Sequence, residues 1–345
     1  MDSVERFLAT VERRPVDRPA AWLGMPDIKA RPALFDYYGV NDFHALKLAV
    51  GDDFYAVEVP YESETANAIY AAFDWYMDGK VDSEERTLTA GGCFKDAEGP
   101  EDTFFFKWPD PAQYIDREKC RYLAQKAPDD KVMLGMMWSA HFQDACAAFG
   151  METAMMNMLA NPEIYEYVND KITAFYLKAN EIFYDAAKGK LKAVLIGNDM
   201  GSQRGLMLSP DMIRRFVMPG CRKLVEQAHS YGLKVIYHSC GSIAEIIPDL
   251  IQAGVDVIHP MQALAAGMDP LELHGQFGDK VAFCGGVDTQ NLLVNGSPAD
   301  VREKVRQLRA IFPTGLIISP SHEAIMPDVP PANIKALFDE ATMVY

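Results

Sequence analysis

The sequence lacks the segments that direct a chain into or across a membrane. It contains no uninterrupted apolar run of about 18 residues, the length that a membrane-spanning helix requires. Residues 1–19 alternate charged and apolar side chains, so they lack the uncharged apolar core of a secretory signal. We therefore expect a cytoplasmic protein with no membrane among its partners.

Basic clusters are also missing. The chain has 33 Lys and Arg residues against 49 Asp and Glu residues, which gives a formal net charge of −16. Binding to nucleic acid needs clustered Lys and Arg to neutralise phosphates, so nucleic acid is not an expected partner. An acidic surface keeps a protein in solution and leaves room for a protein partner with a basic face.

Cysteine is sparse and widely spaced. The six cysteines, at positions 93, 120, 146, 221, 240 and 284, show no closely spaced framework. In a chain of 345 residues this pattern indicates free thiols in a reducing compartment.

Two common glycine motifs of enzymes are absent. No Gly-rich phosphate loop follows an apolar run, which disfavours a dinucleotide-binding fold. No Gly-x-Ser-x-Gly elbow is present either. Glu58 and Asp199 supply carboxyl groups of the kind that glycosidases use in pairs, but nothing in the sequence singles them out.

What the sequence does contain is an alternation of short apolar runs and helical segments. Helices are predicted over 209–232, 242–254, 297–312 and 330–341, and Ser209 followed by Pro210 is a favourable helix start. Apolar strands alternating with helices predict a parallel sheet covered on both faces, and eight such units predict an α/β (β/α)8 TIM barrel in one domain over 1–345. A doubly wound sheet is the alternative. The apolar runs cover residues 20–24, 54–60, 131–138, 192–199, 234–241, 255–260, 280–286 and 315–322.

The segment between the second and third runs departs from this alternation. Within residues 68–118, two short alternating stretches flank EGPED at 98–102. This pattern predicts a β-hairpin that is inserted between strands 2 and 3 of the barrel.

Metal-ligand residue types gather at the predicted strand ends. In a (β/α)8 barrel the active site lies at the carboxyl ends of the strands. Catalytic zinc takes three protein ligands, mostly Cys sulfur and His nitrogen, and keeps a further position open. The residues at these ends are Trp22, Met25, Glu58, Tyr61, Trp138, His141, Asn198, Asp199, His238, Cys240, His259, Gln262, Cys284, Asp288, His322 and Glu323.

The stretch KVIYHSCGS at 234–242 holds the most suggestive pair. His238 and Cys240 are two residues apart, so on a strand both side chains point the same way and could bind one metal ion. A third ligand could come from Cys284 or His322. A Cys240 nucleophile with His238 as its base is less favoured, because side chains two apart on a strand lie roughly 6–7 Å from one another.

Four stretches together resemble the uroporphyrinogen decarboxylase superfamily. They are RPVDRPAAW near the start, the central stretch from NDMGSQRG to KVIYHSCGS, then FGDKVAFCGGVDTQNLL, and SPSHEAIMPDVPPANIKAL near the end. The central stretch is the most specific of the four. The resemblance implies a (β/α)8 barrel, in agreement with the strand count.

One branch of that superfamily decarboxylates tetrapyrroles that carry many carboxylates. Its members have an arginine-rich motif of the form MRQAGR after the first strand and an essential aspartate in an FSDI motif after the second. This chain reads WLGMPDIKARPAL and FYAVEVPYE in those places. Decarboxylation of a tetrapyrrole is therefore kept only as an alternative.

A second branch, the corrinoid-dependent methyltransferases, matches better. Its members bind zinc with a His-x-Cys pair at a strand end and a third ligand, usually Cys, near the last strand. His238 and Cys240 match that pair, and His322 stands where the family often reads Pro-Gly-Cys, with Cys284 as the competing candidate. The resemblance implies transfer of a methyl group between a small substrate and the cobalt of a separate corrinoid protein that carries methylcobalamin.

The resemblance also implies what the site would bind. The small substrate would be a methyl ether, a methylamine or a thiol, and zinc would favour a thiolate or polarise an ether oxygen. Trp22, Met25, Tyr61 and Trp138 would form an apolar rim for an aryl group or a corrinoid face, and Asp199 would cap a helix or bind the substrate. A non-catalytic protein that binds a tetrapyrrole or corrinoid is the remaining alternative.

Overall fold

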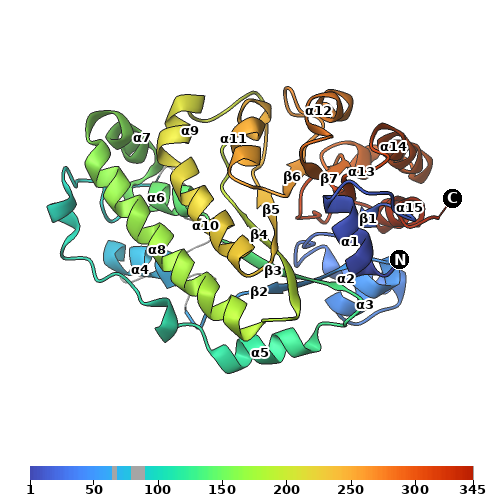
Figure 1. The fold of residues 1–345 in the computed structure, drawn as a ribbon, viewed down its shortest axis with the longest axis horizontal. Coiled ribbons are helices and arrows are strands. Elements are labelled where there is room, and N and C mark those ends of the chain that lie inside the picture. Colours follow the sequence, from blue (N-terminus) through green and yellow to red (C-terminus); the bar gives the residue numbers. More distant parts are fainter. Residues whose placement is uncertain (64–67, 79–89, 345) are drawn as a thin grey trace.

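One curled sheet of eight parallel strands forms the centre of the molecule (Figure 1). The computed structural model describes residues 1–63, 68–78 and 90–344. The strand order is β1-β8-β7-β6-β5-β4-β3-β2, and every strand pair is parallel. The (β/α)8 class and all eight predicted strands are confirmed. The strands are β1 Ala20–Ala21, β2 Phe54–Glu58, β3 Val132–Trp138, β4 Leu191–Gly197, β5 Lys234–His238, β6 Val257–Met261, β7 Ala282–Val287 and β8 Leu316–Pro320.

Helices connect the strands and cover the outside of the sheet. α8 and α10 lie side by side (Figure 1), and α10 packs on β4 and β5. Within the described ranges, no helix combines the length and the apolar character needed to cross a membrane. The helices are α1 Ser3–Val11, α2 Arg31–Tyr38, α3 Phe43–Val50, α4 Ala68–Asp78, α5 Arg117–Lys126, α6 His141–Phe149, α7 Met151–Ala160, α8 Pro162–Ala186, α9 Pro210–Phe216, α10 Met218–Ser230, α11 Ile247–Gln252, α12 Pro270–Phe277, α13 Leu292–Asn295, α14 Pro298–Ile311 and α15 Pro331–Ala341, with short 3-10 turns η1 Pro100–Thr103, η2 Pro111–Gln113 and η3 Ala244–Ile246.

Apolar side chains fill the inside of the sheet, as alternate strand positions point inward in a barrel. This inner cluster includes Leu134, Leu195 and Phe54, and α1 adds Phe7 and Val11 to it. The rings of Phe7 and Phe54 meet edge to face at 5.4 Å. Helix α1 therefore closes the amino-terminal end of the barrel, and the carboxyl ends of the strands are the expected place for a binding site.

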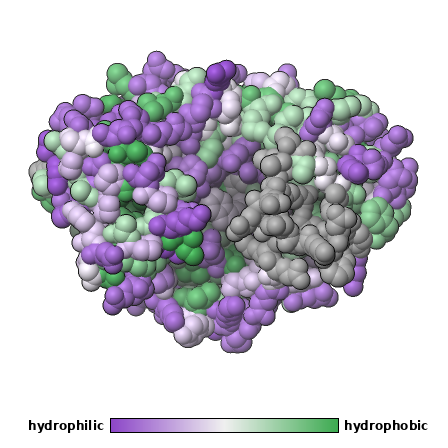
Figure 2. Space-filling model, turned by 180° about the vertical axis from the view of Figure 1, so that it is seen from behind, coloured by the Kyte–Doolittle hydropathy of each residue, from purple (hydrophilic) through white to green (hydrophobic). Residues whose placement is uncertain are grey.

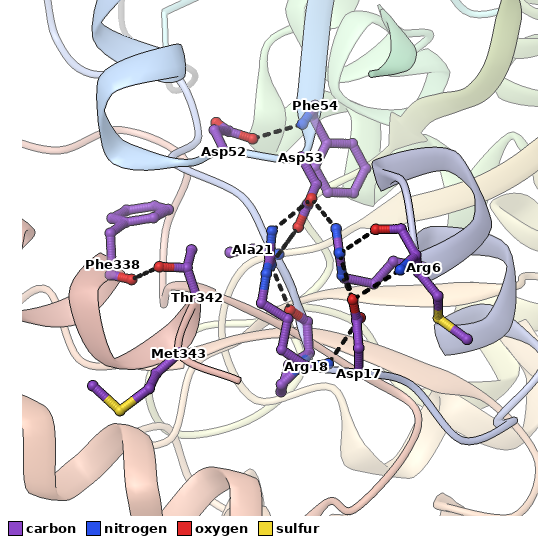
Figure 3. Close-up of polar contacts among 12 residues, drawn as sticks. Arg6, Asp17, Arg18, Ala21, Asp52, Asp53, Phe54, Phe338, Thr342 and Met343 are labelled. Atoms are coloured by element: carbon purple, nitrogen blue, oxygen red, sulfur yellow. Dashed lines mark hydrogen bonds and ion pairs between the residues drawn. The ribbon is translucent and has the colours of Figure 1, made fainter. Parts of the chain in front are cut away.

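The seam between β1 and β2 is closed by carboxylates in place of a strand ladder. One backbone bond joins the Asp53 N–H to the Ala21 carbonyl at 3.0 Å. The Ala21 N–H donates to the Asp53 carboxylate at 2.9 Å, and the Leu23 N–H donates to the Asp52 carboxylate at 2.9 Å. Arg6 and Arg18 both donate to the fully buried Asp53 carboxylate, as Figure 3 shows.

The helix predicted over 209–232 is wrong as one continuous element. It is divided at Val217 into α9 and α10, although Ser209 caps its start as expected. Pro219 is in the first turn of α10. Proline has no N–H and its ring clashes with the carbonyl four residues earlier, so it is tolerated in a first turn and breaks a helix interior.

The β-hairpin predicted around EGPED is also wrong. Residues 93–108 form turns and the 3-10 helix η1, with no strand among them. The Asp102 carboxylate accepts the N–H groups of Glu98 and Gly99 at 2.9 and 3.1 Å, which stabilises a helical turn at Pro100 in place of a hairpin turn. Residues 79–89 of the predicted insertion lie outside the described residues.

The surface opposite to the view of Figure 1 is mostly hydrophilic, with apolar side chains in small scattered groups (Figure 2). This distribution fits the formal net charge of −16. Both termini lie on the same side of the molecule, near β1 (Figure 1).

Candidate functional site

The His238–Cys240 pair lies where β5 ends. His238 is the last residue of β5, and Cys240 follows in a loop that turns at Gly241, whose φ is +83°. The Cys240 Sγ lies 3.4 Å from His238 Nε2. The expectation that strand spacing would keep the two side chains apart is therefore wrong, because the strand stops before Cys240 and the loop folds the thiol back onto the imidazole.

Asp199 comes to this pair from the loop after β4. Its Oδ1 lies 3.2 Å from His238 Nε2 and accepts the Cys240 N–H at 2.9 Å. Gln143 of α6 holds Asp199 by two hydrogen bonds, one to its carboxylate at 3.3 Å and one from its N–H at 3.0 Å. The close approach depends on glycine, since a Cβ on Gly241 would lie 2.6 Å from the backbone of the β4 loop.

His322 and Glu323 lie beside this pair in the loop after β8. The His322 side chain forms a hydrogen bond with Cys240, and its Nδ1 accepts the Ala324 N–H at 3.0 Å. Glu323 Oε2 is 3.5 Å from the Nδ1 atoms of both His238 and His322. This oxygen is buried and has no hydrogen-bond partner of normal geometry among the described residues.

His259 completes the cluster from β6. It pairs with His238 across the sheet, and the two Nδ1 atoms are 3.0 Å apart. Burial and the neighbouring imidazoles of His238 and His322 lower the pKa of His259 well below its usual value, so this ring is neutral. One of the two Nδ1 atoms must therefore donate and the other accept.

The charges in the cluster favour a thiolate beside an imidazolium. Burial alone would lower the pKa of His238, but the hydrogen bonds to Asp199 and Cys240 and the Glu323 charge raise it to about 10. Burial would raise the pKa of Cys240, and the hydrogen bonds with His238 and His322 reverse this and lower it. Burial would likewise raise the pKa of Asp199, and the His238 contact lowers it to about 2.

This set of donors fits a metal ion. The ligand atoms of Asp199, His238 and Cys240 all lie within 4.8 Å of one another, and so do those of His238, His259 and Glu323. Imidazole nitrogen, thiolate sulfur and carboxylate oxygen are the donors that zinc prefers. Metal-binding histidines donate their second N–H to a carboxylate, and Glu323 Oε2 lies where His238 Nδ1 could do so.

Comparison with known proteins assigns the chain to a family. The model of the family Uroporphyrinogen decarboxylase (URO-D) matches residues 107–343, which is more than half of the chain. The chain belongs to the uroporphyrinogen decarboxylase family. A search of curated protein sequences finds no match.

Two solved structures align with this URO-D family chain over nearly its whole length. One, "methyltransferase from Methanosarcina mazei", has a TM-score of 0.71 at 18% identity and covers 99% of this chain and 98% of that one, so the two share a fold. The other, described as a putative vitamin-B12 independent methionine synthase from Listeria monocytogenes, has a TM-score of 0.46 at 12% identity over 96% and 98%. That score is too low to support an argument.

Other predicted site residues of this URO-D family chain contribute no donor atom to the cluster. Cys284 is fully buried inside the barrel. It belongs to neither group of converging donors in the part of the chain that the structure describes. Trp22 is also fully buried, with its ring against Phe54 and His259. Met25 packs partly buried against the inner core.

Tyr61 and Trp138 line a cavity of about 440 Å³ next to the cluster. We call this space the Trp138 cavity. The Trp138 indole also meets the His238 ring edge to face at 5.6 Å, so the cavity adjoins the donor cluster at this ring. The residues that line the cavity are Glu58, Val59, Pro60, Tyr61, Tyr70, Met136, Met137, Trp138, Ala140, Asp144 and Tyr176.

Sequence reasoning missed several residues of this site. From the sequence, His259 before Pro260 has a structural interpretation and Glu323 is only a strand-end residue, although their positions beside His238 and His322 are a signal that points to both. Gln143 and Asp144 gave no signal, because each occupies an ordinary position in the helical segment that follows β3.

Proposed function

We propose that this chain is a zinc-dependent methyltransferase that moves a methyl group between a small substrate and the cobalt of a corrinoid protein. The observation that carries the proposal is the convergence of Asp199, His238 and Cys240, with His322 on the same thiol, at the carboxyl ends of the strands. The likeness in fold to a solved methyltransferase is consistent with it.

His238 Nε2 and Cys240 Sγ are the proposed principal ligands. Asp199 touches His238, and His322 touches Cys240, so these two side chains supply the remaining donors. Cys284 is not proposed as a ligand, since it is fully buried inside the barrel and belongs to neither group of converging donors among the described residues. When bound, zinc would supply a positive centre that favours a thiolate or polarises an ether oxygen.

Residues around the proposed ligands would orient them for binding. Glu323 is placed to hold a proton on His238 Nδ1, which leaves the His238 Nε2 lone pair available. Asp199 and Gln143 fix the loops after β3 and β4 against Cys240. Decarboxylation of a polyanionic tetrapyrrole is less well supported, because the adjoining Trp138 cavity presents carboxyl groups and no described Lys or Arg.

Metal analysis tests the proposal. Protein purified with added zinc and then desalted should retain about one zinc ion per chain. His238→Ala and Cys240→Ser should lose the metal, Asp199→Ala and His322→Ala should bind it more weakly, and Cys284→Ser should retain it as the matched control. Folded wild-type protein that retains no zinc would refute the proposal.

Activity is then measured by absorbance changes of a free corrinoid. The zinc-loaded protein should transfer a methyl group from methylcobalamin to a thiol, or from a methyl ether or methylamine to cob(I)alamin. His238→Ala should abolish the transfer and Cys284→Ser should not. Zinc binding without any methyl transfer would favour a binding protein for a corrinoid or tetrapyrrole.

A further inference from the structure

The Trp138 cavity is large enough for the part of a substrate that does not react. Its volume of about 440 Å³ is in the range of small-molecule sites. It lies between the ends of β2 and β3 and the helices α6 and α8, and it adjoins His238 at the Trp138 ring. A small molecule whose reacting atom lies at His238 and Cys240 could place its other end in this space.

The walls of the cavity are aromatic. Tyr61, Tyr70, Trp138 and Tyr176 contribute rings, and Met136 and Met137 contribute thioethers. The electron-rich faces of Trp and Tyr attract cations, and cages of such rings recognise quaternary ammonium groups. The aromatic walls alone would suit a neutral arene as well as a cation. The charged groups of the cavity distinguish between these two kinds of ligand.

The charged groups of the cavity are all acidic. Glu58 lies at the end of β2 and Asp144 in the first turn of α6, and no Lys, Arg or His is among the described lining residues. No hydrogen bond or ion pair from the described residues engages the Glu58 carboxylate. An anionic substrate end, such as a sulfonate or carboxylate, would meet like charges here, whereas a cation would be complemented.

Asp144 is buried without a cationic partner. Its side chain is 7% exposed, and the Tyr176 hydroxyl donates a hydrogen bond to it. Burial raises the pKa of Asp144 to about 7, and the Tyr176 hydrogen bond opposes the rise only in part. The other groups that face it are Tyr61 and Cys146, both kept neutral because burial raises the pKa of each, together with Glu58 across the cavity.

The backbone at Trp138, in the wall of the cavity, has a strained conformation. Trp138 and the next residue, Ser139, have φ values of 55° and 53°, which bulky side chains rarely adopt. Ser139 is held there by its N–H bond to the Met137 carbonyl at 2.7 Å and by Asn180 of α8. Strain of this kind persists where the surroundings impose it and is concentrated at ligand sites.

We propose that the Trp138 cavity binds a cationic alkylammonium group of the small substrate, with Asp144 and Glu58 as counter-charges and Trp138 as the cation–π wall. The assignment of this group as the non-reacting end of a substrate rests on the proposed methyltransferase function. The Trp138 cavity would favour a substrate that carries a quaternary or methylated ammonium group over one that carries a sulfonate or carboxylate.

The binding test needs no methyl transfer. Choline is titrated into the zinc-loaded full chain and followed by calorimetry and tryptophan fluorescence, beside its uncharged isostere 3,3-dimethylbutan-1-ol and the anion ethanesulfonate. Choline should bind at least about tenfold more tightly than the isostere, since a desolvated cation–π contact with a counter-charge contributes more than a kcal/mol. Ethanesulfonate should not bind measurably.

Variants locate the site. Asp144→Asn should weaken choline binding about tenfold and leave the isostere unchanged, and Trp138→Leu should weaken choline more than the isostere. Glu272→Gln, which removes an equal charge from exposed α12, is the matched control and should change neither. Choline affinity should rise between pH 6 and pH 8 in the wild type, as Asp144 loses its proton, and much less in Asp144→Asn.

The outcomes separate this inference from the proposed function. Equal binding of choline and its isostere, or unchanged choline binding in Asp144→Asn, overturns the ammonium assignment even if zinc and methyl transfer are found. Choline binding as expected in a chain that retains no zinc would uphold the cavity and refute the methyltransferase. Circular dichroism checks that each variant is folded, so that a loss of binding is interpreted only for folded protein.

Discussion

The two ends of the barrel both bury charged groups, but the two ends differ in how completely these groups are paired. At the amino-terminal end, the Asp53 carboxylate is matched by Arg6, Arg18 and the Ala21 N–H (Figure 3). At the carboxyl end, two carboxylates and a thiol surround the imidazoles of His238 and His322, with no Lys or Arg in the described contacts. Complete pairing indicates a structural role, and incomplete pairing indicates a place for a ligand.

The largest expected effect is at the amino-terminal end. Asp53→Ala leaves two guanidinium groups and one N–H without their common acceptor, so the free energy of unfolding should fall by about 3–5 kcal/mol. Urea unfolding measures this loss. Arg14→Ala, which removes an exposed pair with Glu12, should cost less than about 1 kcal/mol. A loss at Asp53 no larger than at Arg14 would show that the seam does not depend on this pairing.

Asp144 should make stability depend on pH. Its pKa in the folded state is raised to about 7 from an ordinary value of 3.8, so the folded chain holds a proton that the unfolded chain has released in this window. Stability should therefore fall as pH rises from 5 to 7, by roughly 2 kcal/mol. Asp144→Asn should remove this component.

The measurement is the difference between wild type and Asp144→Asn in urea unfolding across that pH range. The difference cancels the opposite contribution of His141, whose pKa is lowered to about 4 by burial. Parallel pH profiles for the two proteins would contradict the assigned pKa.

Glu323→Gln should weaken zinc binding at the proposed metal centre without unfolding the chain. The carboxylate is placed to accept from His238 Nδ1 and lies equally close to the His322 ring, and loss of such a partner lowers metal affinity about 10–100-fold. Competition with a chromophoric chelator measures the zinc affinity, with Glu272→Gln as the control. Unchanged affinity would mean that Glu323 does not orient the two histidines.

Cys240 should be the most reactive thiol of the metal-free protein. Its pKa is lowered against the effect of burial by His238 and His322, so iodoacetamide should alkylate it faster at pH 6–7 than an ordinary thiol, by about tenfold. Mass spectrometry of peptides gives the rate for each cysteine. His322→Ala should slow the reaction and zinc should block it. The slow controls are the buried cysteines with raised pKa values, Cys120, Cys146, Cys221 and Cys284.

Much of the fold could be predicted because its determinants are local. Each strand is a short apolar run, and the alternation with helices leaves few possible topologies. Ser209 and Ser297 mark helix starts correctly. The errors arose where one residue outweighs a periodic pattern, as Pro219 does in the divided helix and Asp102 does in the expected hairpin.

The site could be predicted only in part because its contacts join distant elements. The His238–Cys240 pair was visible in the sequence, but their direct contact depends on β5 ending at His238. Cys284 carries the right chemistry, and the inward direction of its strand position removes it from the cluster. Tyr176 and Asp144 are 32 residues apart on two helices, and no local pattern relates them.

The seam between β1 and β2 has a consequence for how sequence change is tolerated. Along the other strand pairs, main-chain groups make the hydrogen bonds, and almost any side chain leaves them intact. Between β1 and β2, the side chains of Asp52 and Asp53 accept the N–H groups of Leu23 and Ala21. Closure of the barrel therefore depends on the side chains of these two neighbouring aspartates. Random substitution should be tolerated far less at these two positions than at the paired strand residues around them.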